Sequence, residues 1–133
     1  MTTLRASNAI ALGPLSAVLV VTMAHAQLPL PAAKPPDGAT LFKQQCATCH
    51  TTNETDAARQ GPTLFKVIGR HAGAIDGFKY SSGLAQADFV WDDARLDGWI
   101  TDPQAMIPGS VMAYRQARPE VRAAIIAYLK ELQ

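Results

Sequence analysis

Two cysteines set the limits on how this chain can fold. They are separated by two residues and followed directly by a histidine, in the run Cys46-Ala47-Thr48-Cys49-His50, and the 133 residues contain no others. A disulfide across two residues would be strained and would close almost no loop, so it cannot staple a small fold. The fold must be held by a hydrophobic core, or by something that the two thiols bind.

The rest of the chain predicts short helices joined by long loops. Asp37 and Asp92 can cap two helices, Pro119 suits the first turn of a third, and Pro103 ends the second by Asp102. No segment alternates strongly enough to predict a strand, so the expected fold is all-α. The expected helices are 38–47, 92–102 and 119–132, with a short helical turn at 81–86 and loops at 51–87 and 104–118.

These helices are too few and too short to build a sufficient core among themselves. Loops of this length indicate function, disorder or a group that fills the middle, and a large apolar cofactor would do so. The residues expected to face inward are Leu41, Phe42, Leu96, Trp99, Ile100, Val121, Ile125, Tyr128, Leu129 and Leu132.

The cysteine motif indicates which cofactor. Two cysteines at this spacing, followed by His50, form the pattern of covalent c-type haem attachment, in which both sulfurs bond one porphyrin and the imidazole faces the iron. A thioredoxin-like redox pair would need a preceding strand, and zinc would need a second pair of ligands. We therefore predict one haem c, bound through Cys46 and Cys49.

The second axial ligand must come from elsewhere in the chain. Met106, Met112 and His71 are the candidates. Met112 follows the rigid Pro108-Gly109 turn, which can hold a sulfur at a fixed distance, whereas most methionines simply pack.

The N-terminal residues predict export. A positive charge at Arg5 precedes an apolar run from 9 to 24 and the small-residue site Ala24-His25-Ala26, as in a secretory signal peptide. We expect cleavage after Ala26 and a periplasmic protein, with residues 27–36 as a proline-rich lead-in and 37–133 as the domain. An uncleaved membrane anchor is the alternative. The formal net charge of +1 argues against nucleic-acid binding.

Taken in order, these residues resemble a class I cytochrome c, of the mitochondrial and bacterial cytochrome c2 type. The likeness covers about residues 37–132 and is far more selective than the attachment motif alone. Its elements are Gly38 and Phe42, the Cys46–His50 motif, Gly61-Pro62-Thr63-Leu64, Gly69-Arg70, 77–81, Trp91, Leu96 with Trp99, Pro103, 107–112 and Ala127-Tyr128-Leu129.

The resemblance implies a small haem-wrapped fold that carries single electrons and is not an enzyme. It implies His50 and Met112 as iron ligands, and a hydrogen bond from the His50 ring to the Pro62 carbonyl. Arg70, Tyr80, Ser81 and Trp91 would surround the haem propionates, although Tyr80 and Trp91 also suit plain core packing. The partners would be redox proteins, and the carrier a monomer.

Three departures from the family pattern matter. Trp99 stands where relatives often have tyrosine near the methionine sulfur, and an indole can donate but not accept. Leu84 replaces an asparagine. Lysines common around the Pro-Gly turn are replaced by Gln104, Ala105 and Val111. We therefore expect docking that is less salt-sensitive than that of a strongly basic cytochrome, and no early displacement of Met112 by lysine.

Two other functions stay open from the sequence. One is a c-type haem protein with a labile distal ligand, giving peroxidase or gas-binding chemistry. The other is a haem subunit of a dehydrogenase complex. The basic residues left for docking are Lys43, Lys66, Lys79, Arg115 and Arg118, while an acidic stretch from Asp88 to Asp102 is expected to lie away from the docking face.

Overall fold

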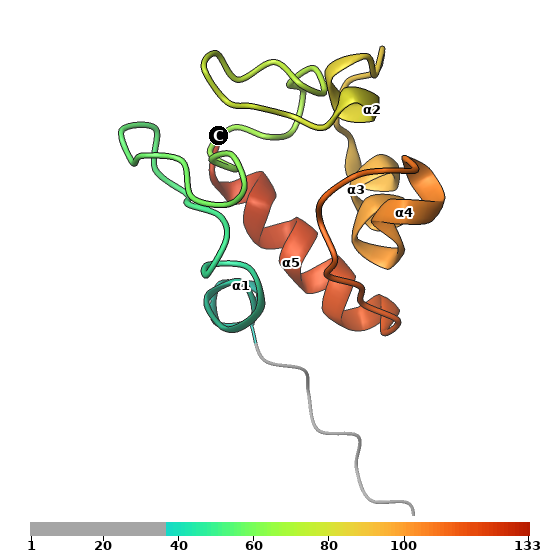
Figure 1. The fold of residues 1–133 in the computed structure, drawn as a ribbon. Coiled ribbons are helices and arrows are strands. Elements are labelled where there is room, and N and C mark those ends of the chain that lie inside the picture. The colour runs from blue at the N-terminus through green and yellow to red at the C-terminus, as the bar shows by residue number, and fades with distance from the viewer. Residues whose placement is uncertain (1–36) are drawn as a thin grey trace, which may run out of the picture. The chain divides into compact units, whose positions relative to one another are not determined.

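The computed structural model describes residues 37–133, which form five helices, with long loops between the first and second and between the fourth and fifth (Figure 1). The only β-type pairing in this range is an isolated bridge between His71 and Val90, so the expected all-α fold is confirmed. None of the helices in this range combines the length and apolar character that a membrane crossing requires. The leader and the proline-rich lead-in expected at residues 1–36 lie outside the described residues. The helices are α1 (Gly38–Gln45), α2 (Ser82–Ala85), α3 (Asp93–Thr101), α4 (Pro103–Met106) and α5 (Pro119–Glu131).

The helix starts follow the expected capping chemistry. Asp37 accepts a hydrogen bond from the Thr40 amide at 3.0 Å, and Asp92 accepts one from the Arg95 amide at 2.7 Å. Pro119 occupies the first position of α5, as expected. α1 ends at Gln45, two residues earlier than the sequence suggested, because Cys46 is its C-cap and the cysteine motif continues as a tight turn.

The expectation of a loop throughout 104–118 was wrong at its start, where α4 forms one helical turn. Pro103 does end α3, but it also begins α4, because the fixed φ of proline suits the first position of a helix. Asp102 lies between the two in extended conformation, and its carboxylate accepts hydrogen bonds from the amides of Gln104 and Ala105, both at 3.1 Å. One residue thus ends one helix and caps the next.

α5 is the centre of the core. It contacts α1 at one side and α3 at the other, and α4 adjoins α3 (Figure 1). Gly38 permits the close crossing of α1 and α5, since a Cβ there would lie 2.1 Å from the Ala124 carbonyl oxygen. Phe42 packs against Tyr128, as expected, with ring centroids 5.5 Å apart. The buried side chains of these three helices are Leu41, Phe42, Leu96, Trp99, Ile100, Val121, Ile125, Ile126 and Leu129.

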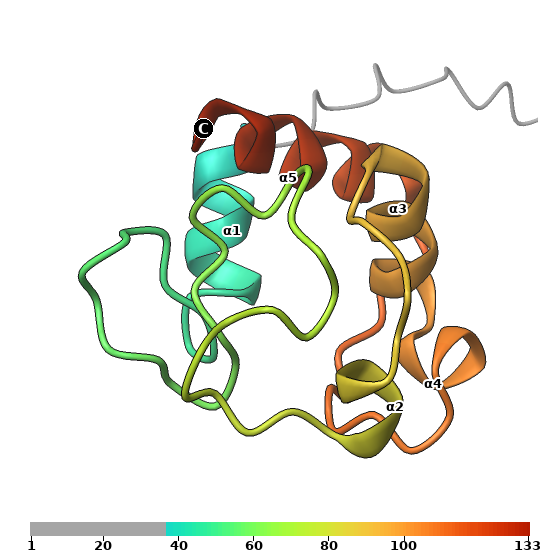
Figure 2. The ribbon, with the colours of Figure 1, turned by 90° about the horizontal axis from the view of Figure 1, so that it is seen from above.

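The loops complete the domain on the side away from this crossing. Figure 2 shows residues 50–80 running out from α1 and returning through α2 toward α3. Arg70 and Trp91 tie the two arms of this excursion together, because the Trp91 amide donates to the Arg70 carbonyl at 2.9 Å and the Gly69 amide donates to the Trp91 carbonyl at 2.8 Å. The loops and the helices together line a cavity.

Candidate haem site

The cavity has a volume of about 450 Å³ and is lined mainly by apolar side chains. Its wall includes two residues of α5, Ile125 and Leu129, and three of α3, Leu96, Trp99 and Ile100. All of the site residues predicted from the sequence line it, namely Cys46, Cys49, His50, Pro62, Arg70, Tyr80, Ser81, Trp91, Trp99 and Met112. The chain therefore brings together, around one apolar space, residues from 46 to 112.

The attachment motif forms a turn at the end of α1. The amides of Cys49 and His50 both donate to the Cys46 carbonyl, at 3.0 and 2.9 Å, which holds both cysteines at the cavity. The two thiols are not joined to one another. Burial, with a smaller effect of Cys49, raises the pKa of the Cys46 thiol to about 11. The Cys49 sulfur lies 3.2 Å from the Gln60 side-chain oxygen, a contact that the sequence did not point to.

The His50 ring is fixed in orientation and tautomer. Its Nδ1 lies 2.8 Å from the Pro62 carbonyl oxygen, which can only accept, so Nδ1 carries the proton and Nε2 keeps its lone pair. Burial, and secondarily the charge of Arg70, lowers the pKa of His50 and favours the neutral ring. Gly61 is required beside it, since a Cβ there would lie 2.2 Å from the His50 Cε1. A neutral ring with its proton on Nδ1 and a lone pair on Nε2 is the imidazole state that binds a metal.

The structure separates the three candidates for a second ligand. Met112 lines the cavity, and its sulfur accepts a hydrogen bond from the Trp99 Nε1 at 3.1 Å. Met106 packs against the core outside the cavity wall, and His71 is exposed. Of the methionine and histidine side chains in residues 37–133, only His50 and Met112 reach the cavity. A thioether sulfur has two lone pairs, so one remains for another partner while the other accepts the indole hydrogen bond.

Polar groups gather along the loop side of the cavity. Arg70 donates to the carbonyls of Phe65 and Thr63, at 2.9 and 2.8 Å. Burial raises the pKa of Tyr80, whose hydroxyl accepts a hydrogen bond from the Ile75 amide at 3.3 Å and stays protonated. The Ser81 hydroxyl is buried without a hydrogen-bond partner in the described residues, and such a group calls for one. Trp91 is buried beside them.

These surroundings fit a large apolar cofactor that carries carboxylates. The orphaned Ser81 hydroxyl, the Arg70 guanidinium and the protonated Tyr80 are the donors that a buried carboxylate needs, and the remaining wall is apolar. Leu84, which replaces an asparagine of the family pattern, also lines the cavity, so this chain lacks that polar group there. Within residues 37–133, no three His, Cys, Asp or Glu side chains gather where they could hold a metal ion.

Sequence reasoning missed three polar side chains near the cavity. Gln45 and Tyr114 line it and contact each other, although 69 residues separate them, and Gln116 joins them. In the structure, half-buried and exposed side chains alternate from Val111 to Ala117, as in an extended segment with one face turned inward, but the residue types there do not alternate and gave no such signal.

The comparisons with known proteins agree with this site. The model of the cytochrome c family matches residues 36–133. The chain is 41% identical to the cytochrome c of Theileria annulata over 103 residues, or 77% of this chain and 89% of that protein. It is 38% identical to the cytochrome c2 of Rhodopila globiformis over 104 residues, or 77% of this chain and 97% of that protein. It is 33% identical to the cytochrome c of Nigella damascena over 102 residues, or 76% of this chain and 92% of that protein. The chain therefore belongs to the cytochrome c family of electron-transfer proteins, which bind haem c covalently through two cysteines, here Cys46 and Cys49.

Proposed function

We propose that this cytochrome c is a periplasmic one-electron carrier whose haem iron is held by His50 and Met112. The ligand assignment rests on which imidazole and thioether side chains line the cavity. Of the imidazoles and thioethers in residues 37–133, only these two line it, and each has a lone pair available. The bound haem supplies a ferric/ferrous couple, and the thioether favours the ferrous form relative to a second imidazole.

The residues of this chain tune that couple in three ways. The hydrogen bond from His50 to Pro62 keeps the ring neutral and oriented. The hydrogen bond from Trp99 withdraws electron density from the Met112 sulfur. Arg70, Tyr80, Ser81 and Trp91 are proposed to surround the propionates, because a buried carboxylate needs donors and a cation to remain ionised. The apolar walls exclude water from the centre.

With both His50 and Met112 bound to the iron, no substrate or gas would reach the metal, which would distinguish a carrier from a peroxidase or gas-binding protein. The test is an optical and redox titration of the purified holoprotein, in both oxidation states. We expect sharp low-spin bands when reduced, no carbon monoxide binding, and a single one-electron transition. A high-spin ferric spectrum, or ready carbon monoxide binding, would rule out this ligand set.

Variants of the three candidate ligands sharpen this test. Replacing Met112 with alanine should convert the protein to a form that binds carbon monoxide, because it opens the second axial position. Met106→Leu and His71→Ala are the matched controls, since both side chains lie outside the cavity wall, and both should keep the parent spectrum. A spectrum unchanged in Met112→Ala but altered in a control would move the assignment to that residue.

The location rests on the sequence of residues 1–26, which has the charge, apolar run and small-residue site of a cleaved leader. We propose a monomeric carrier, without a membrane anchor, that docks onto donor and acceptor proteins. Intact mass of the fractionated protein checks this proposal. A mature chain beginning at Gln27 with one added haem supports it, whereas an intact leader together with a co-purifying dehydrogenase would favour a subunit of a complex.

A further inference from the structure

Met112 lies on an extended segment that belongs to no sheet. Residues 107–118 join α4 to α5, and within residues 37–133 the only β-bridge lies elsewhere, at His71 and Val90. Without a strand ladder, other groups must hold this backbone in place. Main-chain bonds do so at its start, where the Ser110 amide donates to the Ile107 carbonyl at 3.2 Å, and near its end, where the Gln116 amide donates to the Ile100 carbonyl at 2.9 Å. Side chains provide the rest, on both sides of Met112.

The first anchor is the side-chain amide of Gln104, which reaches from α4 across the turn that precedes Met112. Its Nε2 donates to both the carbonyl and the hydroxyl of Ser110, the latter at 3.0 Å, and its Oε1 accepts from the Gly109 amide at 3.2 Å. Ser110 is only 6% exposed, so water cannot readily replace these bonds. Both ends of one amide are therefore used to hold one turn.

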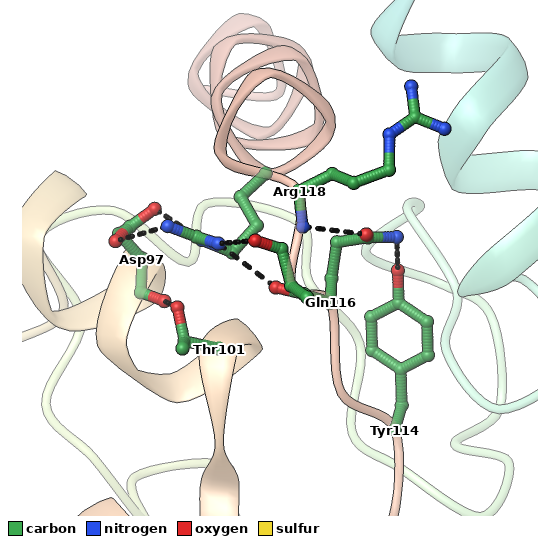
Figure 3. A network of polar contacts seen from close by, with 7 residues as sticks. Asp97, Thr101, Tyr114, Gln116 and Arg118 are labelled. Carbon is green, nitrogen blue, oxygen red and sulfur yellow. Dashed lines mark hydrogen bonds and ion pairs between the residues drawn. The ribbon is translucent and has the colours of Figure 1, made fainter. Parts of the chain in front are cut away.

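The second anchor lies beyond Met112 and joins the segment to α1. The Tyr114 hydroxyl donates to the Gln45 side-chain oxygen, and the Gln116 Nε2 donates to the same oxygen at 3.0 Å. Figure 3 shows Gln116 and Tyr114 in contact, with the Arg118 amide donating to the Gln116 side chain. Arg122 continues the cluster toward α3, since it donates to the Gln116 carbonyl at 3.0 Å and pairs with Asp97 at 2.7 Å.

We propose that Gln104 and Tyr114 are positioning residues that clamp the Met112 segment from its two sides and limit how often the thioether leaves the iron. The proposal rests on the proposed function, which makes Met112 a ligand. The two anchors flank Met112 at Ser110 and Tyr114, and each binds a different helix. Movement of Met112 away from the cavity would break one or the other.

The test uses holoprotein and imidazole as the probe, because a small ligand can reach ferric iron only after the thioether has left. The rate at which imidazole displaces the thioether absorption of the ferric protein measures how often the segment opens. Gln104→Leu keeps the size of the side chain and removes its hydrogen bonds, and we expect the rate to rise about tenfold. Gln104→Glu keeps only the acceptor and opposes a carboxylate to the Ser110 carbonyl, so it should open at least as often.

Tyr114→Phe tests the second anchor, since it removes the hydroxyl but keeps the ring. It should also raise the rate, and the double variant Gln104→Leu/Tyr114→Phe should show the product of the two effects, because the anchors do not share a partner. Gln44→Leu is the matched control: it removes an exposed glutamine from α1 and should leave the rate unchanged.

A second control distinguishes a specific effect on the Met112 segment from a general loss of stability. Ile126→Val destabilises the core away from the cavity wall, so it should lower the unfolding midpoint without changing the imidazole rate. If the parent protein shows thioether absorption but the Gln104 and Tyr114 variants bind imidazole at the parent rate, the clamp is wrong and the ligand set stands. If the parent shows no thioether absorption, the ligand assignment fails and the clamp fails with it.

Discussion

Residue 61 has room for no side chain larger than the hydrogen atom of glycine, because it lies against the His50 ring. The His50 ring lies so close that even a methyl group at residue 61 would overlap it, with a Cβ 2.2 Å from Cε1 and 2.6 Å from Nδ1. Nδ1 is the atom that binds the Pro62 carbonyl. Any side chain at 61 must therefore disturb the bond that orients the imidazole.

We predict that Gly61→Ala displaces the His50 ring and lowers the free energy of unfolding by about 1–3 kcal/mol, the usual cost of overpacking. Denaturant unfolding and the visible spectrum of the holoprotein measure both effects. Gly98→Ala is the matched control, because a Cβ there meets nothing nearer than the Met106 sulfur at 3.9 Å. Inside helix α3 it should instead add about 0.5–1 kcal/mol. Identical spectra and stabilities for parent and Gly61→Ala would contradict the prediction.

Val111 is an uncharged residue at a position where a lysine would affect the response of the protein to alkaline pH. It is 79% exposed, directly before Met112, at a position where the family often has lysine. A lysine can bind iron only once it has lost its proton, and therefore only as the pH rises, whereas Arg115 remains protonated. Residues 107–118 contain no lysine, so with Met112 as the proposed ligand we expect any alkaline loss of its sulfur to be late, or to use hydroxide or a distant lysine.

We predict that Val111→Lys introduces a new transition on the alkaline side, with lysine replacing the thioether. Spectral titration of the ferric holoprotein from neutral to alkaline pH measures its midpoint, and Val111→Gln controls for the change in polarity. The parent and the glutamine variant should keep thioether absorption to a higher pH than the lysine variant. Lysine coordination just above neutral pH in the parent would refute the prediction.

At the scale of elements, the junction of α3 and α4 links helix capping to the site. Asp102 caps α4 with two backbone hydrogen bonds, and it pairs with Arg115 at 3.1 Å. α4 in turn carries Gln104, whose side chain holds the Ser110 turn. The Asp102 cap is therefore linked to the turn before Met112 through α4 and the Gln104 side chain.

We predict that Asp102→Ala lowers the free energy of unfolding by about 1 kcal/mol, the typical cost of losing an N-cap. Asp102→Asn should cost much less, because asparagine caps about as well and an exposed ion pair such as Asp102–Arg115 contributes little. Denaturant melts of both variants measure the difference. Equal losses would mean that the ion pair, and not the cap, stabilises this junction.

The same junction shows where sequence reasoning ends. The three longer helices were predictable, because Asp37, Asp92 and Pro119 are local signals that lie next to the turns they start. Pro103 was interpreted only as a stop, although it also begins α4. The cavity residues followed from the cysteine motif and the family pattern. The contact of Tyr114 with Gln45 joins distant parts of the chain, and no local pattern predicts which partner such a side chain meets.

At the scale of the whole molecule, charges are balanced by pairing. Five ion pairs occur in the described part of the chain, and they engage four of the five aspartates in the acidic stretch, all but Asp88. They also engage Arg115 and Arg118, two of the basic residues expected to remain for docking. Among the expected docking cations, only Lys79 lines the cavity. The other three expected docking cations, Lys43, Lys66 and Lys79, take part in none of these five ion pairs.

We predict that electron transfer depends little on ionic strength. Oxidation of the ferrous holoprotein by anionic ferricyanide and by a cationic cobalt complex, followed by stopped flow, measures the field at the reacting edge. Between low and physiological salt, each rate should change less than about threefold, because few unpaired charges lie near the cavity. A steep fall with the anionic oxidant, mirrored by a rise with the cationic one, would show a basic docking face after all.

The crossing of α1 and α5 has a consequence for how the cavity closes. Gly38 and Phe42 of α1 meet Ala124 and Tyr128 of α5, which lie far along the chain. Ile125 and Leu129 of that final helix also form part of the cavity wall. While α5 is undocked, the cavity beside the two thiols lacks this part of its wall, so it closes on that side only when α1 and α5 cross.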